Sequence, residues 1–316
     1  MNERNNGLFR AVAASLILAA GGALLRLILI WRDVDPATGL FRNGGSFLCG
    51  LFNVGGVVLL AGYLTIAMIL QARRKKAEEL PAPPAEPEEE PEDEYDRFDK
   101  LFADETDGRI APVGKSDPGV PPDVKSALTW DGTLSAFSYF LPGVGFLFFA
   151  LSFILKGQMD ALTFLYSIVC ALCGGYFILA GLRNRADKPV PMAFLGLIPA
   201  LWGTLRMIIQ YRDVQKYVNR GLYVGELLFL ISVVCFFVYQ AQIALGDPGY
   251  AMPLTWVAAA LLVVIFGLSV RVPQLFGLVL DRLGSADLTD GAGLLLDLSL
   301  TFFAGMKLSA IVRRGL

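Results

Sequence analysis

Four charged residues stand inside long apolar stretches of the sequence: Arg26, Arg206, Glu226 and Asp297. A charge in hydrocarbon costs about 2.5 kcal/mol or more at the centre of a membrane helix, so such side chains usually face other helices and find partners. We therefore predict that the four form ion pairs or line a polar site for a small anionic or zwitterionic ligand. Arg206 and Glu226 are the expected pair because they stand on consecutive helices, and Asp297 is expected to face Arg26.

Two other interpretations of these charges remain open. Arg26 and Arg206 each stand six residues before another arginine, Arg32 or Arg212. That spacing is about 9 Å along a helix, a distance that a long side chain can partly cover by reaching toward the membrane surface. Alternatively, the charges pair only to hold the helices together. Neither interpretation requires a ligand.

The chain contains no histidine, which removes most catalytic chemistry from consideration. Without imidazole there is no Ser-His nucleophile and no histidine-ligated zinc or haem. Intramembrane aspartyl chemistry needs two facing carboxylates, and no recognisable motif surrounds Glu226 or Asp297. We therefore expect a protein that is not an enzyme, with no catalytic residues, no metal site and no cofactor.

Two further features of the apolar stretches have simple interpretations. Cys170 and Cys173 are one helical turn apart, and buried thiols of this kind usually pack as small apolar side chains. Lys307 has no aspartate one turn before it, which argues against a retinal-type Schiff base. Its position near the end of the last apolar stretch lets its amine reach the membrane surface.

The elements that must position these residues are membrane helices. Hydrophobic residues make up 55% of the 316, and the mean hydropathy is +0.56. Helices of about 20 apolar residues cross a bilayer and satisfy their own backbone hydrogen bonds. We predict an all-α membrane protein with eight transmembrane helices at Leu8–Trp31, Cys49–Gln71, Leu134–Leu155, Ala161–Leu182, Pro191–Tyr211, Leu222–Leu245, Met252–Val270 and Gly291–Val312.

Two of these helices end in nearly the same sequence. Residues 25–34 and 205–214 are identical at six of ten positions, and each ends in Arg-Asp-Val. The fourth and eighth stretches also both end in arginines. These likenesses predict two parallel four-helix repeats related by an axis along the membrane normal. The expected organisation is helices 1 and 2 in residues 1–71, a loop at 72–133, helices 3 and 4 in 134–188, and a second repeat in 189–316.

Basic residues predict the orientation. The cluster Arg73-Arg74-Lys75-Lys76 directly follows the second apolar stretch, and such clusters remain on the cytoplasmic side. With an even number of helices, both termini are then cytoplasmic. We expect a multi-pass protein of the cell membrane that contacts the lipid bilayer and no nucleic acid.

The loop at 72–133 has a different composition. Residues 81–107 carry twelve acidic residues against Arg97 and Lys100, with five prolines among them, so the loop is expected to be disordered. Tyr95, Phe98 and Phe102 recur at helical spacing, a pattern typical of a segment that folds on a cytoplasmic protein partner. A solvated acidic linker is the simpler interpretation.

Two functions from different classes follow from these patterns. The first is small-solute or lipid handling at the interface of the two four-helix repeats, with Arg26, Arg206, Glu226 and Asp297 lining the polar site. The second is a non-catalytic membrane anchor or assembly subunit that presents the acidic loop to a partner. The sequence names neither the ligand nor the partner.

Deletion of residues 81–107 tests whether the loop belongs to the packed protein. We expect unchanged thermal stability in detergent, because the segment is too charged and too rich in proline to join a packed core. If the loop is the working part, the deletion also abolishes co-purification of a partner. A large loss of stability would show instead that the loop packs on the helices.

Overall fold

The computed structural model describes residues 3–34, 47–78, 133–157, 160–185, 193–214, 220–245, 254–280 and 288–314. Every element in these ranges is a helix. In chain order they are α1 (Glu3–Asp33), α2 (Phe47–Glu78), α5 (Thr133–Lys156), α6 (Ala161–Arg185), η1 (Ala193–Leu197), α7 (Ile198–Val214), α8 (Arg220–Leu245), α9 (Leu254–Phe266), η2 (Gly267–Arg271), α10 (Val272–Val279) and α11 (Leu288–Arg314).

Eight helical stretches in the described ranges are long and apolar enough to cross a membrane, which confirms the predicted all-α membrane fold. The helices α9, η2 and α10 together make the seventh stretch. Large apolar side chains such as Ile17, Val58 and Phe164 cover much of the outer surface. A surface of this kind is stable in lipid and not in water, so the protein is a polytopic membrane protein.

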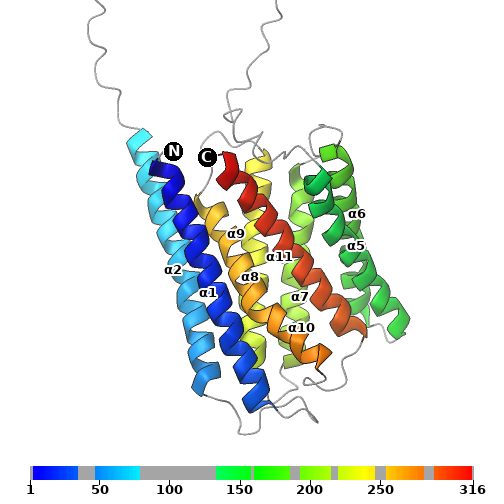
Figure 1. The fold of residues 1–316 in the computed structure, drawn as a ribbon. Coiled ribbons are helices and arrows are strands. Elements are labelled where there is room, and N and C mark those ends of the chain that lie inside the picture. The colour runs from blue at the N-terminus through cyan, green and yellow to red at the C-terminus, as the bar shows by residue number, and fades with distance from the viewer. Residues whose placement is uncertain are drawn as a thin grey trace, which may run out of the picture.

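The helix α9 lies at the centre of the bundle. Its residues from Thr255 to Phe266 are all buried, and it packs against α1, α2, α8 and α11. Figure 1 shows the pair α1 and α2 at one side of the bundle and the pair α5 and α6 at the other. The helix α5 packs against α11 and the helix α6 packs against α7, and these contacts join the pair to the rest of the bundle. The first four membrane helices are thus divided into two pairs by the last four.

Both ends of the described chain lie at the same end of the bundle, as an even number of crossings requires (Figure 1). The two similar segments form the last turns of α1 and α7, and both of these helix ends lie away from the termini. This placement agrees with the parallel orientation of the two segments. The wider four-helix repeat stays a prediction, and the acidic residues 81–107 lie outside the described residues.

Several expected boundaries differ from those of the structure. The helix α2 continues to Glu78, seven residues beyond the expected Gln71, because the arginines and lysines that follow are good helix formers and can lie at the membrane surface. The eighth helix starts at Leu288 and ends at Arg314, so it is longer at both ends than expected. Hydropathy marks only the apolar part of a helix, and polar end turns extend it.

The largest difference concerns the seventh helical stretch. It was expected to end at Val270, but it continues through Arg271 to Val279, and residues 267–271 form a π-helical segment. A π-helical turn inserts an extra residue into a helix and often marks a functional position. The expected end was wrong because hydropathy treats Arg271 as a residue outside the membrane, whereas the structure buries it.

The π-helical segment approaches α11 closely at Gly267. A Cβ atom at this position would lie 2.0 Å from the Thr301 Oγ1 and 2.5 Å from its methyl carbon. The Thr301 hydroxyl donates a hydrogen bond to the Asp297 carbonyl oxygen at 2.8 Å. Glycine at 267 therefore lets the two helices meet where the side chains of Arg271 and Asp297 must reach each other.

Aromatic rings fill the bundle between α5, α6, α7, α8 and α11. Phe177 stacks on Phe146 and makes edge-to-face contacts with Phe237 and Phe303, with ring centroids 5.4 to 5.8 Å apart. Trp202 makes an edge-to-face contact with Phe146 at 4.9 Å. Such pairs add about 0.5–1.5 kcal/mol each beyond the area they bury, so they fix how these helices pack.

Asp160 lies directly before α6 and contacts two helices. Its carboxylate accepts a hydrogen bond from the Thr163 backbone N–H at 2.8 Å, which caps α6, and pairs with Arg212 of α7 at 2.6 Å. The hydrogen bonds from Thr163, and then the Arg212 guanidinium, hold the pKa of the Asp160 carboxyl well below its usual range. Asp160 thus joins the end of α7 to the start of α6.

Substitution of Gly267 by alanine tests the close approach of the π-helical segment to α11. We expect Gly267→Ala to lower the free energy of unfolding in detergent by about 1–3 kcal/mol, because Thr301 must move to admit the methyl group. Adding Thr301→Ala removes the nearest atoms and should recover part of the loss. Gly62→Ala is the matched control, since no atom lies within 4 Å of its added Cβ. Equal stabilities for the two alanine variants would contradict the close contact.

Candidate functional site

The core of the site is an ion pair between α7 and α11. The Arg206 guanidinium binds both carboxylate oxygens of Asp297, and its NH2 lies 2.8 Å from Oδ2. Asp297 is 0% exposed and Arg206 is 8% exposed. The same guanidinium lies 5.3 Å from the centre of the Trp202 ring and 5.5 Å from that of Phe149. A two-pronged pair of this kind holds both side chains in one geometry.

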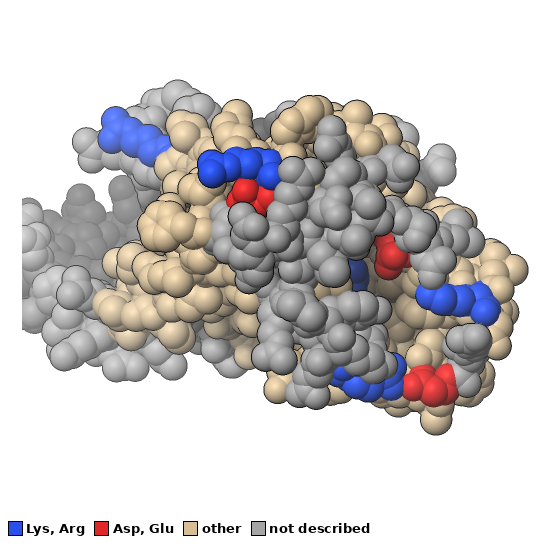
Figure 2. Space-filling view, turned by 90° about the horizontal axis from the view of Figure 1, so that it is seen from below, with Lys and Arg blue, Asp and Glu red and all other residues tan. Residues whose placement is uncertain are grey.

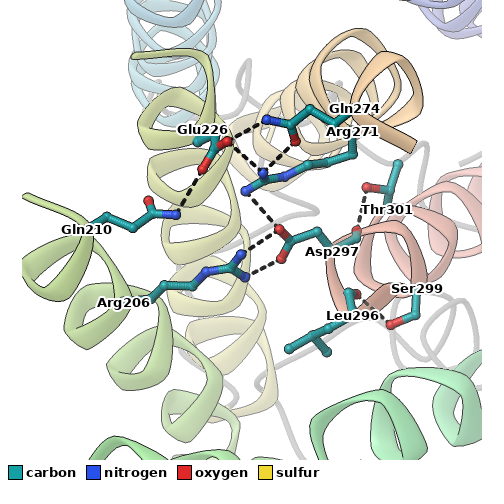
Figure 3. Close-up of polar contacts among 9 residues, drawn as sticks. All are labelled: Arg206, Gln210, Glu226, Arg271, Gln274, Leu296, Asp297, Ser299 and Thr301. Carbon is teal, nitrogen blue, oxygen red and sulfur yellow. Dashed lines mark hydrogen bonds and ion pairs between the residues drawn. The ribbon is translucent and has the colours of Figure 1, made fainter. Parts of the chain in front are cut away.

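Arg271 joins a second carboxylate to this pair. Its NH2 lies 2.8 Å from the Asp297 Oδ2, and its NH1 lies 3.2 Å from the Glu226 Oε1 of α8. The side chain is 4% exposed and lies over the ring of Phe229. Arg271 belongs to the π-helical segment, so the irregular turn of the central helix places a cation between two acids (Figure 3).

Two glutamines complete the hydrogen bonds of Glu226. The Gln210 Nε2 of α7 donates to one carboxylate oxygen at 3.0 Å, and the Gln274 Nε2 of α10 donates to the other. The Gln274 Oε1 accepts a hydrogen bond from the Arg271 NH1 at 2.7 Å. The residues Arg206, Gln210, Glu226, Arg271, Gln274 and Asp297 thus form one connected set, which we call the polar network (Figure 3).

Arg26 of α1 lies beside the polar network. It is 2% exposed, and its guanidinium carbon lies 5.3 Å from the centre of the Phe52 ring of α2. Its NH1 lies 2.4 Å from the position that a Cβ at Gly225 would take, so it rests directly against the backbone of α8 next to Glu226. Arg26 interacts electrostatically with both Glu226 and Arg271.

The four predicted site residues therefore gather in one region, but their predicted pairing is wrong. Arg206 pairs with Asp297 instead of Glu226, and Asp297 pairs with Arg206 and Arg271 instead of Arg26. Pairing was inferred from neighbouring positions in the chain, whereas the long Arg206 side chain reaches past its chain neighbour α8 to Asp297 of α11. The burial of Arg26 and Arg206 also excludes the interpretation that they reach the membrane surface.

Sequence reasoning missed Arg271, Gln210 and Gln274. Arg271 was left outside the seventh helix, which was expected to end at Val270, and the glutamines carry no charge that would mark them as buried ion-pair partners. One signal was available, since Gln274 stands three residues after Arg271 and would share a face with it if the helix continued. Only the packing of the helices could show that this helix continues past Val270.

Lys307 also differs from its expected placement. It is buried, and its Nζ lies 2.7 Å from the Tyr139 hydroxyl oxygen of α5 and 4.5 Å from the centre of the same ring. The expected reach to the membrane surface was wrong because an aromatic neighbour on another helix offers the amine a nearer partner. Lys307 lies near the end of the bundle that holds the termini, apart from the polar network (Figure 1).

Three further features are the cysteines, the predicted partner residues and the charges on the surface. The four cysteines are free thiols, and the described residues contain no group of three or more acidic or cysteine side chains that could hold a metal ion. The proposed partner residues Tyr95, Phe98 and Phe102 lie outside the described residues. At the end away from the termini, the described basic and acidic side chains form small separate groups (Figure 2).

Comparison of the chain with protein-family models, with curated proteins and with solved structures found no match. Any assignment of function therefore rests on the geometry of the polar network and of Arg26.

Replacement of the paired residues tests how the polar network is connected. We expect Asp297→Leu to destabilise the protein by about 3–5 kcal/mol, because it strands both Arg206 and Arg271 among buried groups. Arg206→Leu should cost less, because Asp297 keeps Arg271. The double variant should lose less than the sum of the single losses, as measured by unfolding in detergent.

Arg32→Leu is the control for that series, because the Arg32 side chain is 73% exposed and its neighbour Asp33 is partly solvated. We expect almost no change in stability. Equal losses for Asp297→Leu and Arg206→Leu, with an additive double variant, would rule out the connected network.

Proposed function

We propose that the protein handles a small solute or lipid, which binds at the polar network in the half of the bundle away from the termini. The observation that carries this proposal is the convergence of charges from α7, α8, α11 and the π-helical segment at one depth. Charges within a membrane are costly and usually belong to binding or transport pathways. Stability alone is a weaker explanation, since apolar side chains of similar size would often hold the helices as well.

Two buried polar atoms of the polar network support a ligand over a purely structural role. The Arg271 Nε, a donor, and the Gln210 Oε1, an acceptor, have no hydrogen-bond partner among the described residues. A buried polar atom without a partner costs free energy, and native proteins normally satisfy it with water or a ligand. A network built only to join helices would gain by satisfying both atoms.

The irregular turn of the central helix also supports this proposal. Discontinuous helices recur at the substrate sites of transporters, where unwound turns offer polar groups to a ligand. Here the π-helical segment carries Arg271 and lies inside the bundle. With the termini in the cytoplasm, as the basic cluster after the second helix predicts, the polar network would lie in the outer half of the cell membrane.

A thermal-shift screen tests the proposal. The full-length protein in lipid nanodiscs is heated with small carboxylates, phosphates, amino acids, amines and neutral sugars at constant ionic strength. A solute at 100 times its Kd stabilises the folded state by about 2.7 kcal/mol, which corresponds to a Tm increase of about 5 °C for a protein of this size. We expect one class of solute to raise the Tm of the wild type.

Glu226→Gln shows whether the solute binds at the polar network. This change removes one charge but keeps the shape of the side chain, so the protein should still fold while the shift caused by the solute changes. Asp160→Asn is the matched control, because it also replaces a carboxylate but lies outside the polar network. The proposal fails if no class shifts the Tm, or if Glu226→Gln responds like the wild type.

A further inference from the structure

Two buried polar groups next to Arg206 have no hydrogen-bond partner among the described residues. They are the Tyr166 hydroxyl of α6 and the Trp202 Nε1 of α7, on side chains that are 1% and 0% exposed. A buried polar group without a partner costs free energy, and native proteins normally satisfy it with protein groups or ordered water. Two such groups at neighbouring positions therefore indicate a shared partner.

A third polar group lies with these two. The Cys170 thiol stands one helical turn after Tyr166 on α6 and is also fully buried. Tyr166 interacts with both Trp202 and Cys170, and Cys170 interacts with Trp202. The helices α6 and α7 pack against each other. A hydroxyl, a thiol and an indole N–H thus come together between these two helices.

Neighbouring aromatic rings keep the Tyr166 hydroxyl and the Trp202 N–H from bonding directly. The Tyr166 ring makes edge-to-face contacts with Phe149 and Phe153, with ring centroids 5.9 and 5.5 Å apart. The Trp202 ring makes such a contact with Phe146 at 4.9 Å. Contacts of this kind have a preferred geometry, and a close-packed interior does not deform freely. Each ring is therefore held where its polar group must find a partner other than the facing ring.

We propose that a buried water molecule binds between the Tyr166 Oη, the Trp202 Nε1 and the Cys170 Sγ. Buried waters typically make about three hydrogen bonds to groups that would otherwise be unsatisfied, and this position offers three. The indole N–H can only donate, and water accepts from it while donating to the phenol oxygen or the thiol sulfur. Because the three side chains are almost fully enclosed, the molecule must be small. The inference stands apart from the proposed function and does not depend on it.

A chloride ion is the other small particle that hydroxyl and N–H donors could hold, and the charges nearby do not favour it. Arg206 is the cation that acts on Tyr166, but Asp297 acts on the same hydroxyl with the opposite sign. The Arg206 guanidinium already binds both carboxylate oxygens of Asp297. The two charges therefore offset each other at this position, which suits a neutral molecule.

This water would tie α6 to the polar network, to which α6 contributes no residue. The centre of the Trp202 ring lies 5.3 Å from the Arg206 guanidinium carbon. A hydrogen bond at Nε1 fixes the rotation of the indole, so the ring stays over the guanidinium. Tyr166 and Cys170 thus support Arg206 through Trp202.

An X-ray structure of the full-length protein in a lipidic mesophase tests the proposal directly. Crystals are grown with bromide in place of chloride, because bromide scatters anomalously and water does not. We expect one density peak within hydrogen-bond distance of the Tyr166 Oη, the Trp202 Nε1 and the Cys170 Sγ, with no anomalous signal. This measurement on the wild type decides the question even if a variant does not fold.

Two tyrosine variants show whether the hydroxyl holds the water. Tyr166→Phe removes only the hydroxyl, so the density peak should disappear and the Tm in nanodiscs should fall by about 2–5 °C, because the Trp202 N–H is left without a partner. Tyr211→Phe is the matched control, since the Tyr211 side chain is 62% exposed. Its Tm and its density at Trp202 should equal those of the wild type.

Three results would overturn the proposal. The first is a wild-type map without a peak at this position, with the Tyr166 hydroxyl and the Trp202 N–H bonded to each other or to other groups. The second is an anomalous bromide peak, which would assign the position to a halide. The third is an unchanged water peak in Tyr166→Phe, which would show that the hydroxyl does not hold it. None of these results bears on whether a solute binds at the polar network.

Discussion

The burial of Asp297 is the constraint on which this end of the bundle depends. A fully buried carboxylate is stable only if cations reach it, and here Arg206 of α7 and Arg271 of the π-helical segment both do. The ion pair between Arg271 and Asp297 places three conditions on the helices. The central helix must continue past its apolar stretch, turn irregularly to present Arg271, and approach α11 closely enough to need glycine at 267.

Different interactions hold the helices together at the two ends of the bundle. Near the termini, aromatic rings and the contact of Lys307 with Tyr139 join α5 to α11, and directionless packing is enough to keep the helices together. Near the other end, paired charges fix which helix faces which. A pair such as Arg206 and Asp297 forms at one relative height only, so the polar network sets the height of α7 relative to α11.

The third arginine comes from the part of the bundle that is least enclosed. The helices α1 and α2 lie at one side and expose large apolar side chains such as Leu24 and Val54 to lipid. Arg26 nevertheless points inward, against Phe52 and the backbone of α8 at Gly225. Arg26 thus lies where α1, α2 and α8 meet, beside Glu226.

The sequence by itself determined the membrane helices, because hydrophobic length is a property of each segment alone. It also singled out Arg26, Arg206, Glu226 and Asp297 as charges inside membrane helices. It could not determine their partners. Whether Asp297 meets Arg26 or Arg206 depends on which helices become neighbours, and that is decided by the fit of many side chains at once. For the same reason Arg271 looked like a loop residue: only the carboxylates brought to it by α8 and α11 make its burial stable, so the tertiary structure decided where the seventh membrane helix ends.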